Sequence, residues 1–402
     1  KGADYILQMG IACGDEYPNT GKILTDRYIY WRRGRDVTLS TMTCRGEAPA
    51  AISEIRLYRV KSGRLPQADI KEPPANDDGW RRTFAHYFED VSVGYNFAVD
   101  GDGGDEKSIG PMLDRLIATM KFTGQNVFCY PGCWYGGLMG EVYSPRSHLA
   151  DYRRAYLEKF DRADIYYLPT INQFHLPMTT ADICLAPGKD GTCHDSPLTI
   201  MNDGRISSGA FHGRPTSYNA LHPAVQKNVL DSVDTFIAEG KGHPSFKGIV
   251  LHLTRNSLLW FGNETGGYND YAVKAFARER KVPVPEADGD PLRGKVYADW
   301  IKANAFDEWI DWRCEKIAEF YREIARRLAA ARPDLKLVIN SFLLPDCRHA
   351  DFTKSDFLET ANRRAGLDAR KLADVSNIAI CQSEMPADYR WFGPLDPTNP
   401  KD

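Results

Sequence analysis

The sequence predicts an α/β protein whose larger part is a (β/α)8 barrel of the TIM type, preceded by a small all-β module. Three observations predict this fold class. From about residue 80, short apolar runs alternate with helical stripes, and parallel strands need such crossover helices. β-branched and aromatic residues dominate the N-terminal positions, where no helical stripe persists. The 402 residues are long enough for one large barrel and one smaller domain.

The N-terminal region, residues 1–65, is expected to be β-sandwich-like and to lack its first strands. Residues 66–79 are rich in proline and polar side chains, which is typical of a linker. The barrel domain is therefore expected over residues 80–402. The predicted strands of the N-terminal region are 28–31, 37–43 and 52–60.

Six strands alternate with helices in the barrel region. The helices are expected from apolar stripes at three- and four-residue steps, of which the longest runs from Ile310 to Leu328. Because short right-handed crossovers favour adjacency, we expect the strands to be parallel neighbours in sequence order. With only six units found, the barrel is expected to be truncated after strand six. The predicted strands are 83–88, 126–130, 165–169, 247–253, 335–340 and 377–382.

A doubly wound open sheet is the structural alternative. No glycine-rich nucleotide turn follows the first strand, which counts against it. A strand order that reverses midway, with helices on both faces of the sheet, would exclude the barrel.

Composition excludes several classes of function. The formal net charge is −3 and the isoelectric point about 6.4, which argues against nucleic acid or an anionic membrane surface as a partner. No apolar run reaches the roughly 20 residues that a membrane helix needs. No cysteine or histidine spacing fits a zinc site and no phosphate loop occurs, so we expect neither a metal nor another cofactor. The sequence does not indicate an oligomeric state.

The cysteines and the chain ends bear on cellular context. The nine cysteines are scattered and odd in number, so most are expected to be free buried thiols. The chain begins at Lys1 without a methionine or a signal segment and ends in a proline-rich stretch. Both ends are typical of a fragment or a processed product.

One connection carries more polar and aromatic side chains than folding requires. The run from Ile249 to Leu253 is expected to be a buried strand, and a loop follows it. Loops at strand ends are where a rigid scaffold presents binding and catalytic groups. This loop is typical of the rim of a sugar-binding site. Its candidate substrate-binding residues are His252, Arg255, Asn256, Trp260, Tyr268, Asn269 and Asp270.

Two further strand ends carry candidate substrate-binding residues. Tyr130, Trp134 and Tyr135 follow strand two in a glycine-rich stretch, where large rings either stack on a sugar or pack beneath the loop. Asn340 ends strand five. We expect one pocket at the C-terminal ends of the strands, where barrel enzymes carry their active sites. Its expected lining is Tyr130, Trp134, His252, Arg255, Trp260 and Asn340.

Several short motifs carry a family resemblance. They are Ser245-Phe-Lys-Gly, Leu259-Trp-Phe-Gly, Gly267-Tyr-Asn-Asp-Tyr, and the helix with Trp309, Trp312 and Arg313. With them, residues 80–390 resemble poorly characterised bacterial glycosyl-hydrolase-like barrel proteins, related to the barrel glycoside hydrolases that carry an Asn-Glu pair after strand four. The resemblance implies a carbohydrate substrate, a periplasmic or extracellular location, and Glu264 of the Asn263-Glu264 pair as the general acid/base.

Glycoside cleavage needs two carboxyl groups, about 5–5.5 Å apart for retention of configuration and about 6.5–9.5 Å apart for inversion. Glu264 and Glu384 rank highest because aromatic residues flank both, and Glu384 ends strand six. For each, the alternative is a solvated loop carboxylate. The sequence predicts a glycoside hydrolase acting on a poly- or oligosaccharide through this pair. A non-catalytic carbohydrate-binding barrel and an interaction module of a larger cell-surface enzyme are the alternatives.

Overall fold

The computed structural model describes part of the chain, and the described residues fall into two compact units, which are treated separately below. The first contains the N-terminal strands, and the second contains the described residues from Phe84 to Gln382. The described residues are 5–12, 24–31, 51–59, 84–86, 106–135, 137–138, 150–173, 176, 196–207, 210–211, 214–215, 218–254, 257–341 and 357–382.

The N-terminal unit contains an antiparallel sheet of three strands, β1 (Tyr5–Ala12), β2 (Leu24–Trp31) and β3 (Ala51–Arg59), in the order β2-β1-β3. Strands β2 and β3 coincide with two predicted strands, whereas β1 was not predicted. The third predicted strand, 37–43, lies outside the described residues. The described residues of this unit form a single sheet, so the sandwich stays a prediction.

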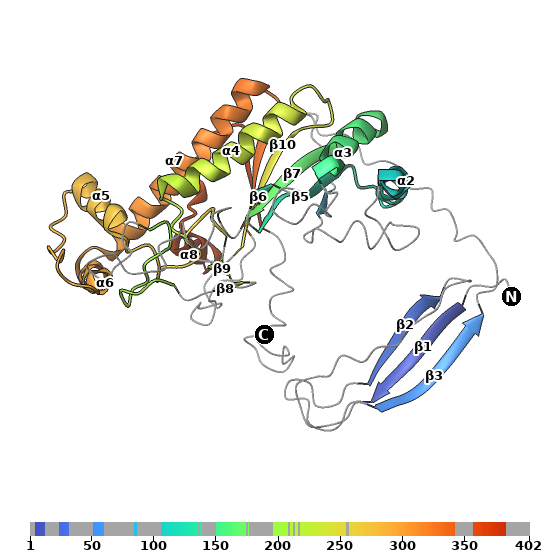
Figure 1. Cartoon of the computed structure of the whole chain (residues 1–402), viewed down its shortest axis with the longest axis horizontal. Helices are drawn as coiled ribbons and strands as arrows, with labels where there is room; N and C mark the ends of the chain where they lie inside the picture. The colour runs from blue at the N-terminus through green and yellow to red at the C-terminus, as the bar shows by residue number, and fades with distance from the viewer. Residues whose placement is uncertain are drawn as a thin grey trace. The chain divides into compact units, whose positions relative to one another are not determined.

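The larger unit is built on a sheet whose main strands run in the order β12-β11-β10-β7-β5-β4. All pairs between these neighbours are parallel, and the order follows the sequence without reversal (Figure 1). The predicted strand order is therefore confirmed. The strands are β4 (Phe84–His86), β5 (Val127–Tyr135), β7 (Tyr166–Gln173), β10 (Gly248–Leu253), β11 (Lys336–Ser341) and β12 (Ile378–Gln382).

Short strands and helices complete this unit. The strands β6 (Gly137–Leu138), β8 (Ala210–Phe211) and β9 (Arg214–Pro215) were not predicted; β6 turns back on β5, and β8 pairs with β9. The helices are α2 (Glu106–Phe122), α3 (Ala150–Ala163), α4 (Pro223–Gly240), α5 (Asp270–Arg280), α6 (Arg293–Asn304), α7 (Phe306–Ala331), α8 (Phe357–Ala365) and the 3-10 turn η2 (Ala369–Leu372).

Helix α4 illustrates how the sequence sets these elements. Pro223 opens the helix, where its missing N–H costs no intrahelical bond, and His222 Nδ1 accepts a hydrogen bond from Ala224 N at 3.1 Å. Val225 and Val229 recur at helical spacing on the buried side. The sequence therefore fixes both the start of the helix and the face that it buries.

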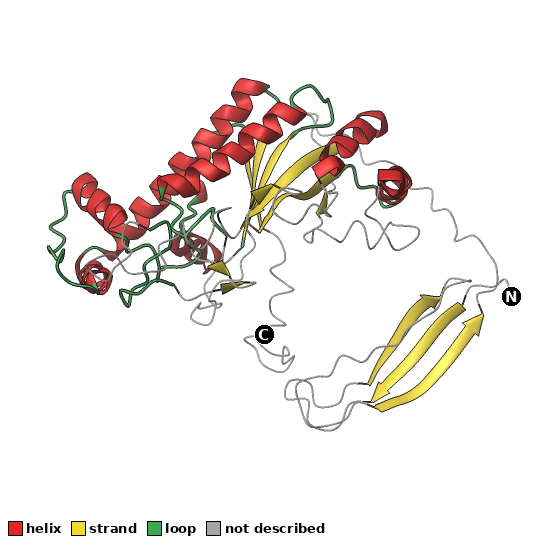
Figure 2. Cartoon of the chain, in the orientation of Figure 1, coloured by secondary structure: helices red, strands yellow, loops and turns green. Residues whose placement is uncertain are grey.

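Four helices pack on one face of the sheet (Figure 2). Leu116 of α2, Phe160 of α3, Val229 of α4 and Leu328 of α7 share one core cluster with outward-facing strand residues such as Leu251. Burial of this apolar surface is the main stabilising contribution, at about 25 cal/mol per Å² removed from water. The opposite face of the sheet therefore receives none of these four helices.

The inner face packs against itself. Val127, Leu168, Val250 and Val338, from four different strands, form a cluster with Cys129 that contains strand residues alone. A flat sheet would expose such a face. In the described part of the chain, β4 and β12 are the edges of this parallel sheet, and its closure into a barrel stays a prediction.

Helices α5 and α6 lie between β10 and α7, where no helix was predicted. They pack with the first turns of α7 in a second core that includes Phe276, Ile301, Trp309 and Trp312. The rings of Trp309 and Trp312 stack at a centroid distance of 5.3 Å. The aromatic residues at the start of α7 therefore serve this core.

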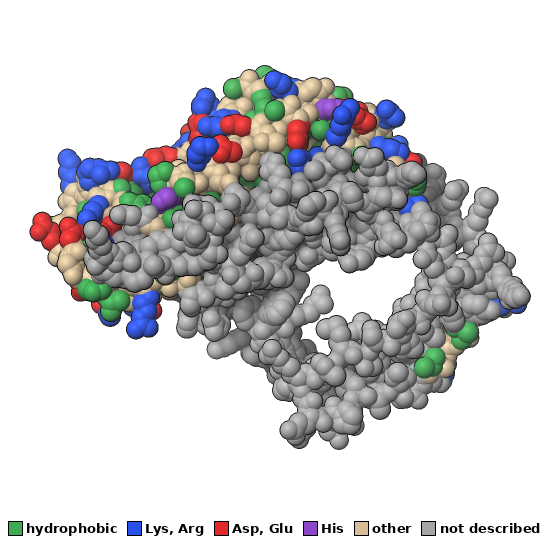
Figure 3. Space-filling model, in the orientation of Figure 1, with side chains coloured by type: hydrophobic (Ala, Val, Ile, Leu, Met, Phe, Trp, Pro, Cys, Tyr) green, Lys and Arg blue, Asp and Glu red, His purple; other side chains and the backbone are tan. Residues whose placement is uncertain are grey.

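The helix side of the larger unit is charged with both signs. On the face shown in Figure 3, Lys and Arg side chains alternate with Asp and Glu side chains over the helices. Ion pairs such as Arg327–Asp234, which joins α7 to α4, lie on this side. Among the described helices, none is long and apolar enough to cross a membrane.

Candidate functional site

Three polar side chains join across neighbouring strands near the C-terminal edge of the sheet. Asn340 Nδ2 on β11 lies 3.1 Å from His252 Nδ1 on β10, and Cys381 Sγ on β12 lies 3.6 Å from Asn340 Oδ1. His252 and Asn340 are both 2% exposed. We call the inner-face residues Asn172, His252, Asn340 and Cys381 the polar row.

The register of the sheet aligns this row. His252 pairs with Asn340, and Asn340 pairs with Cys381. On β7, Thr170 pairs with Val250 of β10. Side chains two residues apart on a strand point to the same face, so Asn172, two residues after Thr170, lies level with His252, two residues after Val250. The inner face thus changes from an apolar layer to a polar layer within two residues, toward the edge where barrel enzymes carry their active sites.

The hydrogen bonds of the polar row fix its orientation. With the Cys381 thiol donating to Asn340 Oδ1, the Asn340 amide N–H donates to His252 Nδ1. Nδ1 then accepts, so the imidazole is neutral and carries its proton on Nε2. Although the residue as a whole is exposed, partial desolvation of the thiol raises the pKa of Cys381, which keeps this thiol protonated as a donor. Both predicted site residues, His252 and Asn340, therefore belong to one hydrogen-bonded unit.

The loop after β10 is closed by a tryptophan. The Trp260 indole N–H donates to Thr254 O at 2.7 Å, and Leu258 N donates to Gln173 O at 2.9 Å. Trp260 is 2% exposed and belongs to the main core, so the ring stabilises the loop instead of lining the expected pocket. Arg255 and Asn256, within this loop, lie outside the described residues.

The Asn263-Glu264 pair lies in a turn held by α7 and α8. Asn263 Oδ1 accepts from Thr265 N at 2.9 Å and from Thr265 Oγ1 at 2.8 Å, which makes this side chain part of the turn. Arg313 Nη2 donates to Asn263 O at 2.6 Å. The Glu264 carboxylate, 36% exposed, lies 3.5 Å from Arg364 Nη1. Glu264 therefore has an arginine partner, and Asn263 serves the turn.

Arg313 itself is buried without a carboxylate at ion-pair distance among the described residues. Its guanidinium lies 3.9 Å from the centroid of the Phe261 ring, a cation–π geometry. Burial lowers the pKa of Arg313 to about 10. Burial also raises the pKa of Tyr268, although the charge of Arg313 opposes this shift.

Asn269 has a structural role in place of the expected contact with substrate. Its Oδ1 accepts from Ile200 N at 3.1 Å and from Asn219 Nδ2 at 3.0 Å. Its Nδ2 donates to Leu198 O at 2.8 Å and to Ser196 O at 3.4 Å. These four bonds use both ends of the amide, so neither end is free for a ligand.

Tyr268 and Asp270 are likewise used within the protein. The Tyr268 ring stacks on Trp309 at 5.7 Å, and its hydroxyl donates to Glu264 O at 3.0 Å. Asp270 accepts from Arg293 Nε at 2.9 Å in the first turn of α5. The two residues hold α5 in place, which corrects the expectation that they contact substrate.

The aromatic residues of β5 divide into two groups. Tyr130 is 2% exposed and packs against Phe128 and Tyr156 on the helix side of the sheet. It therefore faces away from the polar row, and the expected pocket that combines it with His252 is wrong. Trp134 and Tyr135 belong to β5 by backbone, and their side chains lie outside the described residues.

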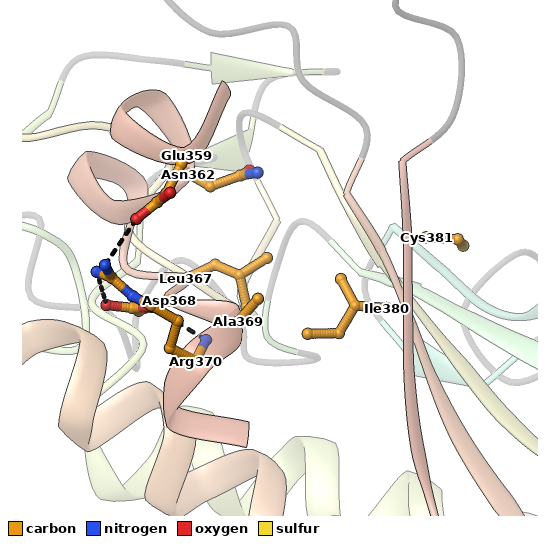
Figure 4. Close-up of a pocket in the computed structure, with 8 residues that line it drawn as sticks. All are labelled: Glu359, Asn362, Leu367, Asp368, Ala369, Arg370, Ile380 and Cys381. Atoms are coloured by element: carbon orange, nitrogen blue, oxygen red, sulfur yellow. Dashed lines mark hydrogen bonds and ion pairs between the residues drawn. The ribbon is translucent and has the colours of Figure 1, made fainter. Parts of the chain in front are cut away.

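A cavity of about 350 Å³ lies between β12, α8 and η2. Figure 4 shows Ile380 directed toward Leu367 and Ala369, while Cys381 points to the other side of β12. The charges at the cavity pair with each other, since Arg370 lies 2.9 Å from Glu359 and 2.8 Å from Asp368. Most of the lining therefore comes from the helix side of β12, and Cys381 belongs both to the lining and to the polar row.

Sequence reasoning missed Asn172 and Cys381 of the polar row. The available signal was the alternation of polar and apolar residues in Thr170-Ile-Asn172, which is typical of a strand with one polar face. No group of three or more His, Cys, Asp or Glu side chains suited to a metal ion occurs among the residues that the structure describes. Glu384 lies outside the described residues, two positions after β12 ends.

The four cysteines with described side chains are all free. Cys129, Cys133 and Cys314 are buried, and Cys381 is exposed. Burial, and to a smaller extent Cys381, raises the pKa of Cys129, so this thiol stays protonated at neutral pH.

No protein-family description matches the chain, and no curated protein matches its sequence. Similar solved structures include the PgaB (BpsB) glycoside hydrolase domain from Bordetella bronchiseptica, with TM-score 0.43 and 11% identity over 74% of this chain and 73% of that one. A cold-adapted β-galactosidase from Rahnella sp. R3 gives TM-score 0.38 and 18% identity over 69% of this chain. A β-galactosidase from Bacillus circulans gives TM-score 0.37 and 14% identity over 64% of this chain.

The matched regions span 37% of the Rahnella enzyme and 36% of the Bacillus enzyme. All three neighbours are described as glycoside-cleaving proteins or domains. At these TM-scores the likeness carries no argument, so the function must be argued from the residues of this chain.

Proposed function

We propose that residues 84–382 form the greater part of a (β/α)8 barrel, and that the protein is a glycoside hydrolase acting on a poly- or oligosaccharide at the C-terminal edge of that barrel. The polar row is the observation that supports this proposal. It brings amide, imidazole and thiol groups together on the inner face at the edge where barrel enzymes bind substrate.

Sugars are recognised by hydrogen bonds to hydroxyl groups, and the polar row has the groups for this. In the orientation described above, the His252 imidazole has a proton on Nε2 and acts there as a donor. Asn340 is already engaged on both sides, so it holds His252 in that tautomer. His252 is thus proposed as a neutral hydrogen-bond donor instead of a general base.

The proposed catalytic pair is Glu264 and Glu384. Glu384 comes two positions after β12 in the sequence, and it is proposed as the second carboxylate because it follows the end of strand six. Glu264 remains the proposed general acid/base on the basis of the Asn263-Glu264 motif. Glu264 Oε1 lies 3.5 Å from Arg364 Nη1, and this contact must be released for Glu264 to reach a substrate.

A panel of chromogenic glycosides tests the proposal. The full chain is expected to cleave at least one of them, and Glu384→Gln is expected to lower kcat by roughly 10²- to 10⁴-fold, the contribution of a catalytic carboxylate. Glu264→Gln tests the second role in the same way. Glu319→Gln, on the solvent side of α7, is the matched control and should retain full activity. Full activity in both Glu264→Gln and Glu384→Gln would contradict the catalytic assignment.

One observation favours a second candidate function, a non-catalytic carbohydrate-binding barrel. Among the described residues, the polar row contains no carboxylate, and Glu264 is paired with Arg364. A protein of this kind would bind oligosaccharides in calorimetry and cleave none of the panel. Cleavage that both glutamate variants abolish would exclude it.

A further inference from the structure

Asn172 is a buried amide without a hydrogen-bond partner in the described part of the chain. It lies on β7, next to the last residue of the strand, and is 1% exposed. Neither its Nδ2 nor its Oδ1 has a hydrogen-bond partner among the described residues. Buried polar groups in folded proteins are nearly always hydrogen-bonded, so an amide with both ends unsatisfied calls for a water molecule or a ligand.

Two nearby hydroxyl groups share this property. Thr170 is 1% exposed and Thr254 is 6% exposed, and neither Oγ1 has a hydrogen-bond partner in the described part of the chain. Thr170 precedes Asn172 by one alternation on β7, and Thr254 comes directly after β10, in a turn in which its N–H donates to His252 O at 3.2 Å. The unsatisfied groups therefore gather on β7 and directly after β10, beside the polar row.

The other buried asparagines of the described chain are satisfied by the protein. Asn269 makes hydrogen bonds through both Oδ1 and Nδ2. Asn219, which is 0% exposed, donates through Nδ2 to Asn269 Oδ1 and accepts through Oδ1 from Leu221 N at 3.0 Å. The protein thus satisfies these two buried amides at both ends, whereas both ends of Asn172 are unsatisfied among the described residues.

We propose that Asn172 is a specificity-determining residue of the carbohydrate site and that its amide binds two neighbouring hydroxyl groups of one sugar ring. A carboxamide presents an acceptor and a donor side by side, and a vicinal diol presents the complementary pair. One hydroxyl donates to Oδ1, and the other accepts from Nδ2. The hydroxyls of Thr170 and Thr254 bind the same ring or a water molecule at its edge. This inference rests on the proposed function, since it names the part of the sugar that the site recognises.

The proposal predicts opposite effects of one substitution at two buried asparagines. Asn172→Leu removes an unsatisfied amide and should raise the melting temperature of the unliganded full chain by roughly 2 °C or more. Asn219→Leu removes a satisfied amide and should lower it by a similar or larger amount. Asn172→Ala and Asn219→Ala repeat the comparison with a smaller side chain in case leucine does not fit. A loss of stability in the Asn172 variants equal to that in the Asn219 variants would overturn the proposal.

Binding supplies the second measurement. The affinity of the full chain for a panel of defined oligosaccharides of glucose, galactose, mannose and N-acetylglucosamine is measured by calorimetry. Asn172→Leu and Asn172→Ala should each lower the affinity for the oligosaccharide that the wild type binds most tightly by roughly 10- to 100-fold, as expected for the loss of two hydrogen bonds in a buried site. The control is Glu319→Gln, which should bind as the wild type does.

The two hypotheses fail in different ways. If the wild type binds an oligosaccharide and Asn172→Leu binds it equally well, Asn172 does not contact the sugar, and the inference is overturned while the proposed function stands. If the wild type binds no member of the panel, the proposed function and the inference fall together. Weakened binding combined with a raised melting temperature supports the inference, because a purely structural residue would not give both.

Discussion

Asn269 provides a quantitative test of the structural role that the fold gives to a residue in the candidate loop. Asn269→Leu replaces the amide with an apolar side chain of similar length. Two donors, Ile200 N–H and the Asn219 amide, then lose their acceptor, and the carbonyl of Leu198 loses its donor at 2.8 Å. All of these groups are buried with the side chain, which is 0% exposed.

The expected magnitude follows from these lost partners. An unsatisfied buried donor costs about 1–3 kcal/mol, so the two donors alone amount to about 2–6 kcal/mol. The added apolar surface of leucine offsets part of this cost. We therefore expect the free energy of unfolding to fall by about 3–4 kcal/mol.

Urea unfolding, followed by tryptophan fluorescence, measures this change. The chain has eight tryptophans, and two of them, Trp309 and Trp312, are buried in the core that α5 helps to form, so the signal includes the affected region. The urea concentration at the midpoint should fall, while the slope of the unfolding free energy against urea concentration stays constant. This combination identifies a change in stability. The control is Asn202→Ala, at an exposed position two residues after Ile200, whose N–H donates to Asn269. A loss below about 1 kcal/mol in Asn269→Leu would refute the assignment of these hydrogen bonds.

Three further predictions concern other contacts of the larger unit. Burial alone would raise the pKa of Asp161, but hydrogen bonds from Ser245 and His243 lower it below its usual value of 3.8. The stabilising effect of the Asp161 charge is therefore present above pH 3.8 and is lost as the pH falls further. Melting curves should show that Asp161→Asn destabilises the protein at pH 7 and that the difference from the wild type shrinks toward pH 3, whereas a constant difference would contradict the role of the charge. Trp260→Phe removes the donor to Thr254 O and should lower the free energy of unfolding by about 1 kcal/mol. The same substitution should speed hydrogen exchange in the loop after β10. Unchanged exchange would contradict the role of Trp260 in holding this loop. Arg332 donates to His243 O at 2.9 Å and to two further backbone carbonyls, an arrangement that a lysine cannot reproduce. Arg332→Lys should therefore lower the urea concentration at the unfolding midpoint. An unchanged midpoint would contradict these contacts.

The strands of the larger unit could be predicted because each is a short apolar run with flanking turn residues. The strand around Val250 is buried on both faces, so hydropathy marked it without any knowledge of its neighbours. Helix α7 was found from its long apolar stripe for the same reason. Helices α5 and α6 were missed because their sequences are more polar and their apolar residues face a core that depends on Trp309 and Trp312.

The candidate site was predictable only in part. His252 and Asn340 were expected at strand ends, and parallel pairing brings strand ends together. Tyr268 and Asn269 were misinterpreted because their partners lie in distant parts of the sequence, such as Leu198 and Trp309. A polar residue in a loop looks the same in sequence whether it binds a ligand or a buried backbone group. Asn172 was missed because nothing in the sequence says which strand amides are left unsatisfied.

The central claim is that a carbohydrate binds at the polar row, and the location of binding tests it most directly. Nuclear magnetic resonance of the full chain, with labelled histidine and asparagine side chains, is recorded during titration with the best oligosaccharide of the panel. The claim predicts that the imidazole of His252 and the amide signals of Asn172 and Asn340 shift with the same binding curve, while those of Asn219 and Asn362 stay constant. Shifts confined to Asn362, which lines the cavity beside β12, would place the ligand on the helix side and contradict the claim.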